Sequence, residues 1–96
     1  MLLAMSREEF LEFLKLKNFP EPVLVEQPAN GSLDVHTHDF EVFALVSEGS
    51  IAITSCEIEM VYKQGQVFHL PFRQPHTERY GVDGVKYLAS RKMHSA

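Results

Sequence analysis

The first apolar residues of the chain recur at helical spacing, over residues 7–17. The residues of this apolar stripe are Phe10, Leu11, Phe13 and Leu14, with Leu16 as a further candidate. Ser6 and Glu9 form a Ser-x-x-Glu capping box before the stripe, and two prolines soon after it end the helix. The pattern predicts a short helix at about 7–17, inside an N-terminal helical segment 1–22. Because so short a helix is unstable alone, we expect it to pack on the rest of the domain or on a dimer partner.

From residue 23 onward the pattern changes to short apolar runs separated by turn residues. The runs are 23–26, 33–38, 40–46, 51–54, 57–62, 66–70, 76–80 and 85–90. Turn pairs such as Asn30-Gly31 and Asp83-Gly84 favour hairpins, because both residues accept positive φ. Regularly spaced short strands predict an antiparallel sandwich or barrel, and nothing resembles the crossover helices of a parallel α/β sheet. We therefore expect an all-β domain over residues 23–96.

The run 40–46 is apolar at nearly every position. A strand with one solvent-facing side should alternate between apolar and polar residues, so this strand is expected to be covered on both sides. One side faces the barrel interior, and the other faces the N-terminal helix or a second subunit. This is the sequence basis for expecting a homodimer.

Composition and charge narrow the classes of function. The chain of 96 residues is long enough for one domain, and 45% hydrophobic residues are typical of a folded protein. The formal net charge of −4 and the absence of a basic block indicate no nucleic-acid partner. A single cysteine, Cys56, excludes a disulfide framework and fits a reducing compartment. With no signal or membrane-spanning pattern, we expect a cytoplasmic protein with no membrane partner.

Histidine is the residue type that indicates chemistry. His36 and His38 are two residues apart in a predicted strand, so their side chains leave the same face. Two imidazoles on one face can converge on one ion, and imidazole suits Zn, Cu, Fe and Ni. Taken alone, His-x-His is weak evidence for a metal. Another histidine, His94, lies in a polar C-terminal tail and is not a candidate ligand.

Two segments of the chain resemble the two sequence blocks of the cupin family. In the first block the matching residues are Gly31, His36, His38, Glu41 and Gly49. In the second block they are Gly65, Pro71 and His76. The resemblance spans about residues 31–90 and implies an antiparallel jelly-roll barrel, here with a short N-terminal α-helix. It also implies that His36, His38 and His76 are metal ligands.

The chain departs from the cupin pattern at three positions. The usual carboxylate ligand falls at Val42, one residue after Glu41, and an offset of one residue turns a strand side chain to the opposite face. Either a bulge turns Glu41 inward or the site has three histidines alone, and we favour three histidines. The glycine of the second block's Pro-x-Gly is Arg73, and its final asparagine is Tyr80.

Two further residues near these blocks are weaker candidates. In a regular strand Glu78 shares the face of His76, where it would act as a catalytic acid or base or orient a ligand histidine. A surface ion pair with an arginine is an equal alternative for Glu78. His69 is expected to be a hydrogen-bonded wall residue rather than a fourth ligand.

Three neutral nitrogen ligands leave open coordination positions, which is typical of a catalytic metal site. We expect a divalent transition metal, namely Zn, Ni, Fe or Cu. The favoured function is a small metalloenzyme, an oxygenase, isomerase or lyase, that acts on a polar small molecule. The alternatives are a non-catalytic barrel that binds or senses a small ligand, and a metal-free barrel whose histidines only form hydrogen bonds.

Overall fold

Helix α1 (Arg7–Leu16) begins at the predicted capping box. In the computed structural model, which describes residues 4–93, the Ser6 hydroxyl accepts the N–H of Glu9 at 3.1 Å. The Glu9 carboxylate accepts the N–H of Ser6 at 2.9 Å in return. The helix ends before Asn18, whose φ of 59° lies in the left-handed region. His94 lies outside the described residues.

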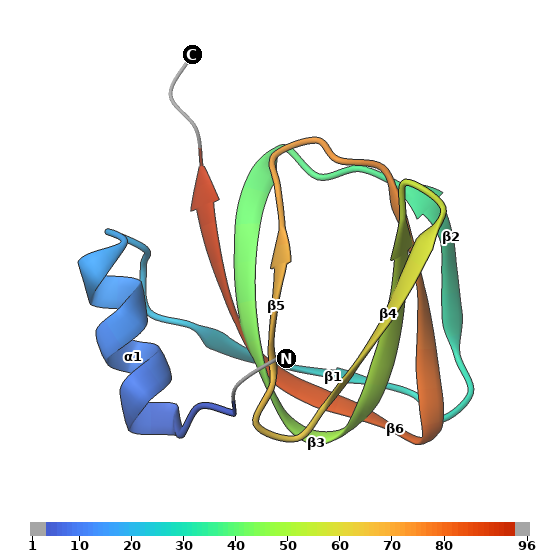
Figure 1. Cartoon of the computed structure of the whole chain (residues 1–96), viewed down its shortest axis with the longest axis horizontal. Coiled ribbons are helices and arrows are strands. Elements are labelled where there is room, and N and C mark those ends of the chain that lie inside the picture. The colour runs from blue at the N-terminus through green and yellow to red at the C-terminus, as the bar shows by residue number, and fades with distance from the viewer. Residues whose placement is uncertain (1–3, 94–96) are drawn as a thin grey trace.

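Six strands follow within residues 4–93 (Figure 1). They are β1 (Val23–Gln27), β2 (Ser32–His36), β3 (Phe40–Ser55), β4 (Ile58–Lys63), β5 (Val67–Leu70) and β6 (His76–Met93). The long strands β3 and β6 pair with each other, and all pairs are antiparallel. The short strands β1 and β2 pair with β6, whereas β4 and β5 pair with β3. The antiparallel all-β class predicted from the sequence is therefore confirmed, with one short helix.

The six strands form one hydrogen-bonded sheet, and bends in the long strands β3 and β6 fold it into two halves, which are the two sheets of the barrel. In the first sheet, residues 40–46 of β3 pair with β5 on one side and with residues 87–93 of β6 on the other. β6 pairs in turn with β1. In the second sheet, beyond the bend, residues 51–54 of β3 pair with β4 on one side and with residues 77–80 of β6 on the other. This part of β6 pairs in turn with β2. Two predicted turns, at 48–50 and 83–84, are thus bends inside continuous strands, with register shifts beside Glu48 and Gly49.

The bend requires two glycines that face each other. Gly49 and Gly84 both have a φ of 73°, in the region that favours glycine. A Cβ on Gly49 would lie only 2.1 Å from the carbonyl oxygen of Gly84. The two backbones therefore approach more closely than any side chain allows.

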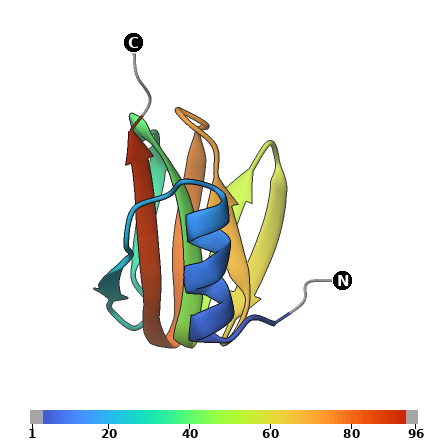
Figure 2. The same ribbon diagram turned by 90° about the vertical axis from the view of Figure 1, so that its left-hand side faces the viewer.

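Helix α1 covers the outer face of the sheet formed by β5, β3, β6 and β1 (Figure 2). Phe10 is fully buried and, with Leu14, packs against Leu45 of β3. Phe13 also contacts Phe43 edge to face, with ring centroids 4.9 Å apart. The apolar run 40–46 is thus covered on both sides within one chain. The homodimer remains a prediction, since this run no longer requires a second subunit.

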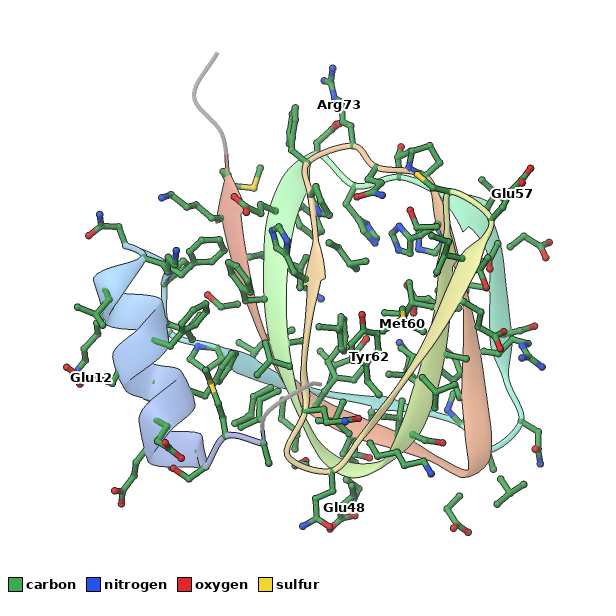
Figure 3. All side chains as sticks on the ribbon, in the orientation of Figure 1. Glu12, Glu48, Glu57, Met60, Tyr62 and Arg73 are labelled. Carbon is green, nitrogen blue, oxygen red and sulfur yellow. The ribbon has the colours of Figure 1, made fainter. Side chains whose placement is uncertain are left out.

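The barrel core lies between the two sheets. Val42, Ala44 and Val46 alternate with the helix-facing residues of β3 and point into the core. Tyr62 of β4 packs on Phe68 inside the barrel, whereas Glu12, Glu48, Glu57 and Arg73 lie at the periphery (Figure 3). Among the described residues, no helix is long and apolar enough to cross a lipid bilayer.

Candidate metal centre

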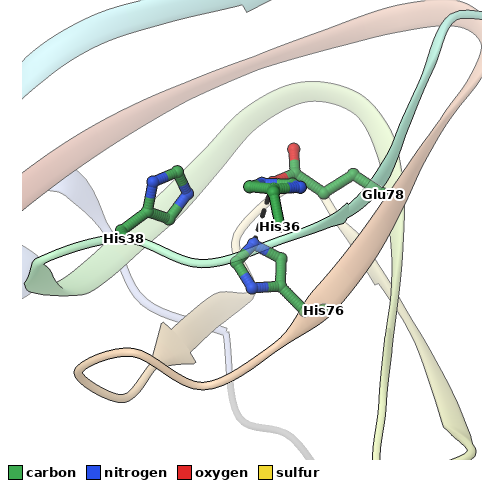
Figure 4. Close-up of side chains that lie close together, drawn as sticks. All are labelled: His36, His38, His76 and Glu78. Atoms are coloured by element: carbon green, nitrogen blue, oxygen red, sulfur yellow. Dashed lines mark hydrogen bonds and ion pairs between the residues drawn. The ribbon is translucent and has the colours of Figure 1, made fainter.

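Four side chains converge at the end of the barrel where β2 and β5 end and β6 begins (Figure 4). His36 is the last residue of β2, His38 lies in the following loop, and His76 and Glu78 lie at the start of β6. Each offers one ligand atom, and these atoms all lie within 4.8 Å of one another. His76 and Glu78 are 2% and 5% exposed. The fold therefore brings together the three histidines singled out in the sequence and adds a carboxylate.

The pairing of β2 with β6 explains why these residues meet. His36 and His76 are register partners, after a register shift between Leu33 and His36. Their ring centroids lie 4.3 Å apart. His38 is beyond the end of β2, yet its ring centroid lies 4.9 Å from that of His36 and 5.3 Å from that of His76. The His38 ring also stacks on Phe40, which fixes its direction.

A backbone contact holds the loop that carries His38. The N–H of Arg73 donates to the carbonyl oxygen of His38 at 3.0 Å, and the Arg73 side chain pairs with Asp39 at 2.9 Å. Arg73 has a φ of 57°, in the left-handed region. This conformation explains why a glycine suits the same position in the second cupin block.

Glu78 connects the two paired histidines. Its Oε2 lies 3.2 Å from Nε2 of His36 and 3.1 Å from Nε2 of His76. Its Oε1 accepts a hydrogen bond from the Tyr80 hydroxyl at 3.0 Å. Both oxygens of this buried carboxylate therefore have partners, and two of the three partners are imidazoles.

The other nitrogen of each histidine faces the backbone. Nδ1 of His36 lies 2.7 Å from the carbonyl oxygen of Asp34, and Nδ1 of His76 lies 3.0 Å from that of Gln74. A carbonyl oxygen only accepts, so each Nδ1 donates a proton to it. In a neutral imidazole, Nε2 then carries a lone pair directed at the carboxylate of Glu78, whereas a protonated imidazole donates a hydrogen bond from Nε2 to that carboxylate.

The ionisation of the group follows from these contacts. Burial, the largest influence on Glu78, would raise its pKa, but the hydrogen bonds from His76 and Tyr80 and the nearby imidazoles outweigh it and lower the pKa. The hydrogen bond to Glu78 raises the pKa of His76 against the effect of burial. Burial, and then the neighbouring His36 and His76, lower the pKa of His38, which favours its neutral, ligating form.

The structure places Glu41 outside this group. The β3–β6 register is regular at Glu41 and Val42, so the bulge considered for Glu41 does not occur there. Val42 faces the core, whereas Oε2 of Glu41 lies 2.6 Å from Nε2 of His69. His69 stacks on Phe43, which contacts helix α1, so this pair lies on the outer face of the barrel. The carboxylate beside the histidines comes from the second block, not the first.

The chain matches no protein-family model and no curated protein, but solved structures share its fold. A cupin superfamily protein from Desulfitobacterium hafniense is 17% identical, with a TM-score of 0.67, over 98% of this chain and 75% of that one. The cupin domain of Schizosaccharomyces pombe Cnp3 is 18% identical, with a TM-score of 0.67, over 97% of this chain and 64% of that one. An RmlC-like cupin protein from Desulfovibrio desulfuricans is 26% identical, with a TM-score of 0.59, over 74% of this chain and 69% of that one. The fold is that of a small cupin-type domain, as the sequence blocks predicted.

Proposed function

We propose that His36, His38, His76 and Glu78 bind a divalent transition metal, and that the protein is a small metalloenzyme acting on a polar small molecule. The reaction class would be that of an oxygenase, isomerase or lyase. One observation carries the metal assignment: the Nε2 atoms of His36 and His76 both point at Oε2 of Glu78.

A cation accounts for this arrangement better than protons do. With Nδ1 donating to a carbonyl, a neutral imidazole and a carboxylate oxygen face each other as two acceptors. Protonating both histidines would place two positive charges in rings only 4.3 Å apart, beside a single buried carboxylate. One divalent ion satisfies all these acceptors at once, and its binding displaces any proton held on Nε2 of the two histidines. The backbone carbonyls then act as the outer partners that orient ligand histidines.

The donor set limits the metal and assigns Glu78 a role. Three imidazoles and a carboxylate suit Zn, Ni, Fe or Cu. Such an ion polarises a bound substrate or lowers the pKa of bound water. Glu78 in this proposal is a ligand rather than the free acid or base considered from the sequence. The surrounding protein orients the ligand side chains, and it shields His76 and Glu78 from water, since both are buried.

A non-catalytic ligand-binding barrel is the second candidate. It is favoured by the lining of the pocket beside the site, which is mainly apolar. With Glu78 bound to metal, the described lining residues offer no other carboxylate for acid or base catalysis. A ligand retained through purification without turnover would favour this candidate over the enzyme.

Elemental analysis of untagged protein purified without added metal tests the metal site. We expect near-stoichiometric metal in the wild type and none above background in His36→Ala and His76→Ala, with circular dichroism showing that the barrel stays folded. His69→Ala is the matched control, because His69 lies on the outer face and should not alter occupancy. Full occupancy in either site variant, or no uptake by the wild type after reconstitution, would contradict the proposal.

A further inference from the structure

A pocket of about 120 Å³ lies inside the barrel against the candidate metal centre. His38 and Glu78 form part of its wall, and most of the remaining wall is apolar, including Val42, Phe68 and Leu70. An engineered apolar cavity of about 150 Å³ in another protein holds benzene. This pocket therefore suits a small molecule with a short apolar body.

Arg91 provides the positive charge at the mouth of this pocket. Tyr87, Ala89 and Arg91 follow one another on the same face of β6, and the first two are buried in the core. Among the described residues that line the pocket, Arg91 is the only lysine or arginine, and it is exposed to solvent. Its guanidinium carbon lies 5.5 Å from the centroid of the Phe40 ring, which stacks in turn on His38. Arg91, Phe40 and His38 thus form a stack from the rim to the metal centre.

The guanidinium of Arg91 has no carboxylate partner among residues 4–93. Arg73 and Arg79, by contrast, pair with Asp39 and Glu59. A guanidinium forms its strongest contacts with carboxylate and phosphate groups, as two parallel hydrogen bonds. An unpaired arginine at the end of an inward-facing row is therefore available to an anionic ligand.

We propose that the pocket binds a small monocarboxylate whose carboxylate pairs with Arg91 and whose apolar body lies between the sheets. The far end of such a ligand lies beside His38 and Glu78. The inference rests on the proposed function for the nearness of a metal to the ligand, whereas pairing with Arg91 requires no metal. It narrows the substrate class from polar small molecules to short carboxylic acids.

Isovalerate, a short branched monocarboxylate, and its uncharged amide isovaleramide test this inference. Each is titrated into metal-free and zinc-loaded protein, and binding is followed by amide chemical shifts in NMR spectra. We expect isovalerate to bind about tenfold more tightly than isovaleramide, both to the metal-free and to the zinc-loaded protein. Only the carboxylate of isovalerate forms a hydrogen-bonded charge pair with the guanidinium. Arg91→Gln should reduce isovalerate affinity to that of the amide. Arg79→Gln, which changes an exposed arginine paired with Glu59, is the matched control and should have no effect.

The outcomes separate this inference from the metal assignment. Equal affinity for the acid and the amide, or undiminished isovalerate binding in Arg91→Gln, would overturn the pairing with Arg91. If isovalerate binds only to the zinc-loaded protein and is insensitive to Arg91→Gln, its carboxylate binds the metal, which overturns this inference and supports the proposed function. Tighter binding of methyl phosphate than of isovalerate would overturn the carboxylate class. Loss of binding in Arg91→Gln, in a protein that takes up no metal, would support the inference while the proposed function fails.

Discussion

The hydroxyl of Tyr80 donates a 3.0 Å hydrogen bond to Oε1 of Glu78, while the other oxygen of Glu78 faces the imidazoles. Tyr80 is buried and stands where the second cupin block has an asparagine. Val42 stands where the first block has its carboxylate. The carboxylate that position 42 of β3 does not offer is thus present at Glu78 on β6, where the Tyr80 hydroxyl holds it.

Replacing Tyr80 by phenylalanine tests this orientation. We expect Tyr80→Phe to weaken zinc binding about tenfold, as is usual when a residue that orients a ligand is removed. It should also lower the free energy of unfolding by about 1 kcal/mol. Calorimetric titration and urea denaturation measure the two effects. Tyr62→Phe makes the same change on β4 and should leave zinc affinity unaltered; equal affinities for all three proteins would refute the role of Tyr80.

The source of the carboxylate is tested by two glutamine variants. Glu78→Gln keeps the shape of the side chain but removes its charge, so we expect zinc affinity to fall by more than about 100-fold, beyond the usual effect of an outer partner. Glu41→Gln changes the carboxylate that contacts His69 and should leave zinc affinity as it is. The reverse result would show that Glu41, not Glu78, is the ligand.

The bend between the sheets predicts unequal costs for two alanine substitutions. Gly49→Ala places a methyl group 2.1 Å from a backbone carbonyl oxygen at positive φ, so it should destabilise the fold by roughly 3 kcal/mol. Gly81→Ala meets Oγ of Ser50 at 2.2 Å, but that side chain can rotate away, and we expect roughly 1 kcal/mol. Urea denaturation compares them, and equal stabilities would contradict the crossing of backbones at Gly49.

A stabilising change is expected at Arg73. Its φ of 57° strains a residue with a side chain, by roughly 1–2 kcal/mol, and glycine removes this strain. The greater flexibility of glycine in the unfolded chain offsets roughly 0.5–1 kcal/mol of that gain. The exposed ion pair with Asp39 contributes little. Arg73→Gly should therefore unfold at a higher temperature than the wild type, and a lower temperature would show that the side chain holds the loop.

Much of the fold could be read from local sequence patterns. The capping box predicted the start of α1 correctly. The rings of His36 and His38 lie close together as expected, but His38 is in the loop after β2 and not in the strand on which that expectation was based. The turn signals at Gly49 and Gly84 were real, but local residues do not distinguish a hairpin from a bend. Only the continuous pairing of β3 with β6 decides that these positions are bends.

The role of Glu78 was the part of the site that the sequence left open. Its spacing from His76 indicated the shared face, and the structure places both on it. Whether that face met solvent, an arginine or another histidine depended on the partner strand. The β2–β6 register sets His36 opposite His76, and this long-range pairing is not encoded in either segment alone.

The position of β2 at the edge of its sheet has a consequence for the kinetics of the site. Within residues 4–93, β2 pairs only with β6. Its residues Leu33 and Val35 are 44% and 70% exposed, so little packing resists its detachment. An ion held by His36 on β2 and by His76 and Glu78 on β6 would fasten this edge to the rest of the molecule. Release of the ion and exchange of the β2 amide hydrogens with solvent would then both depend on the same local opening.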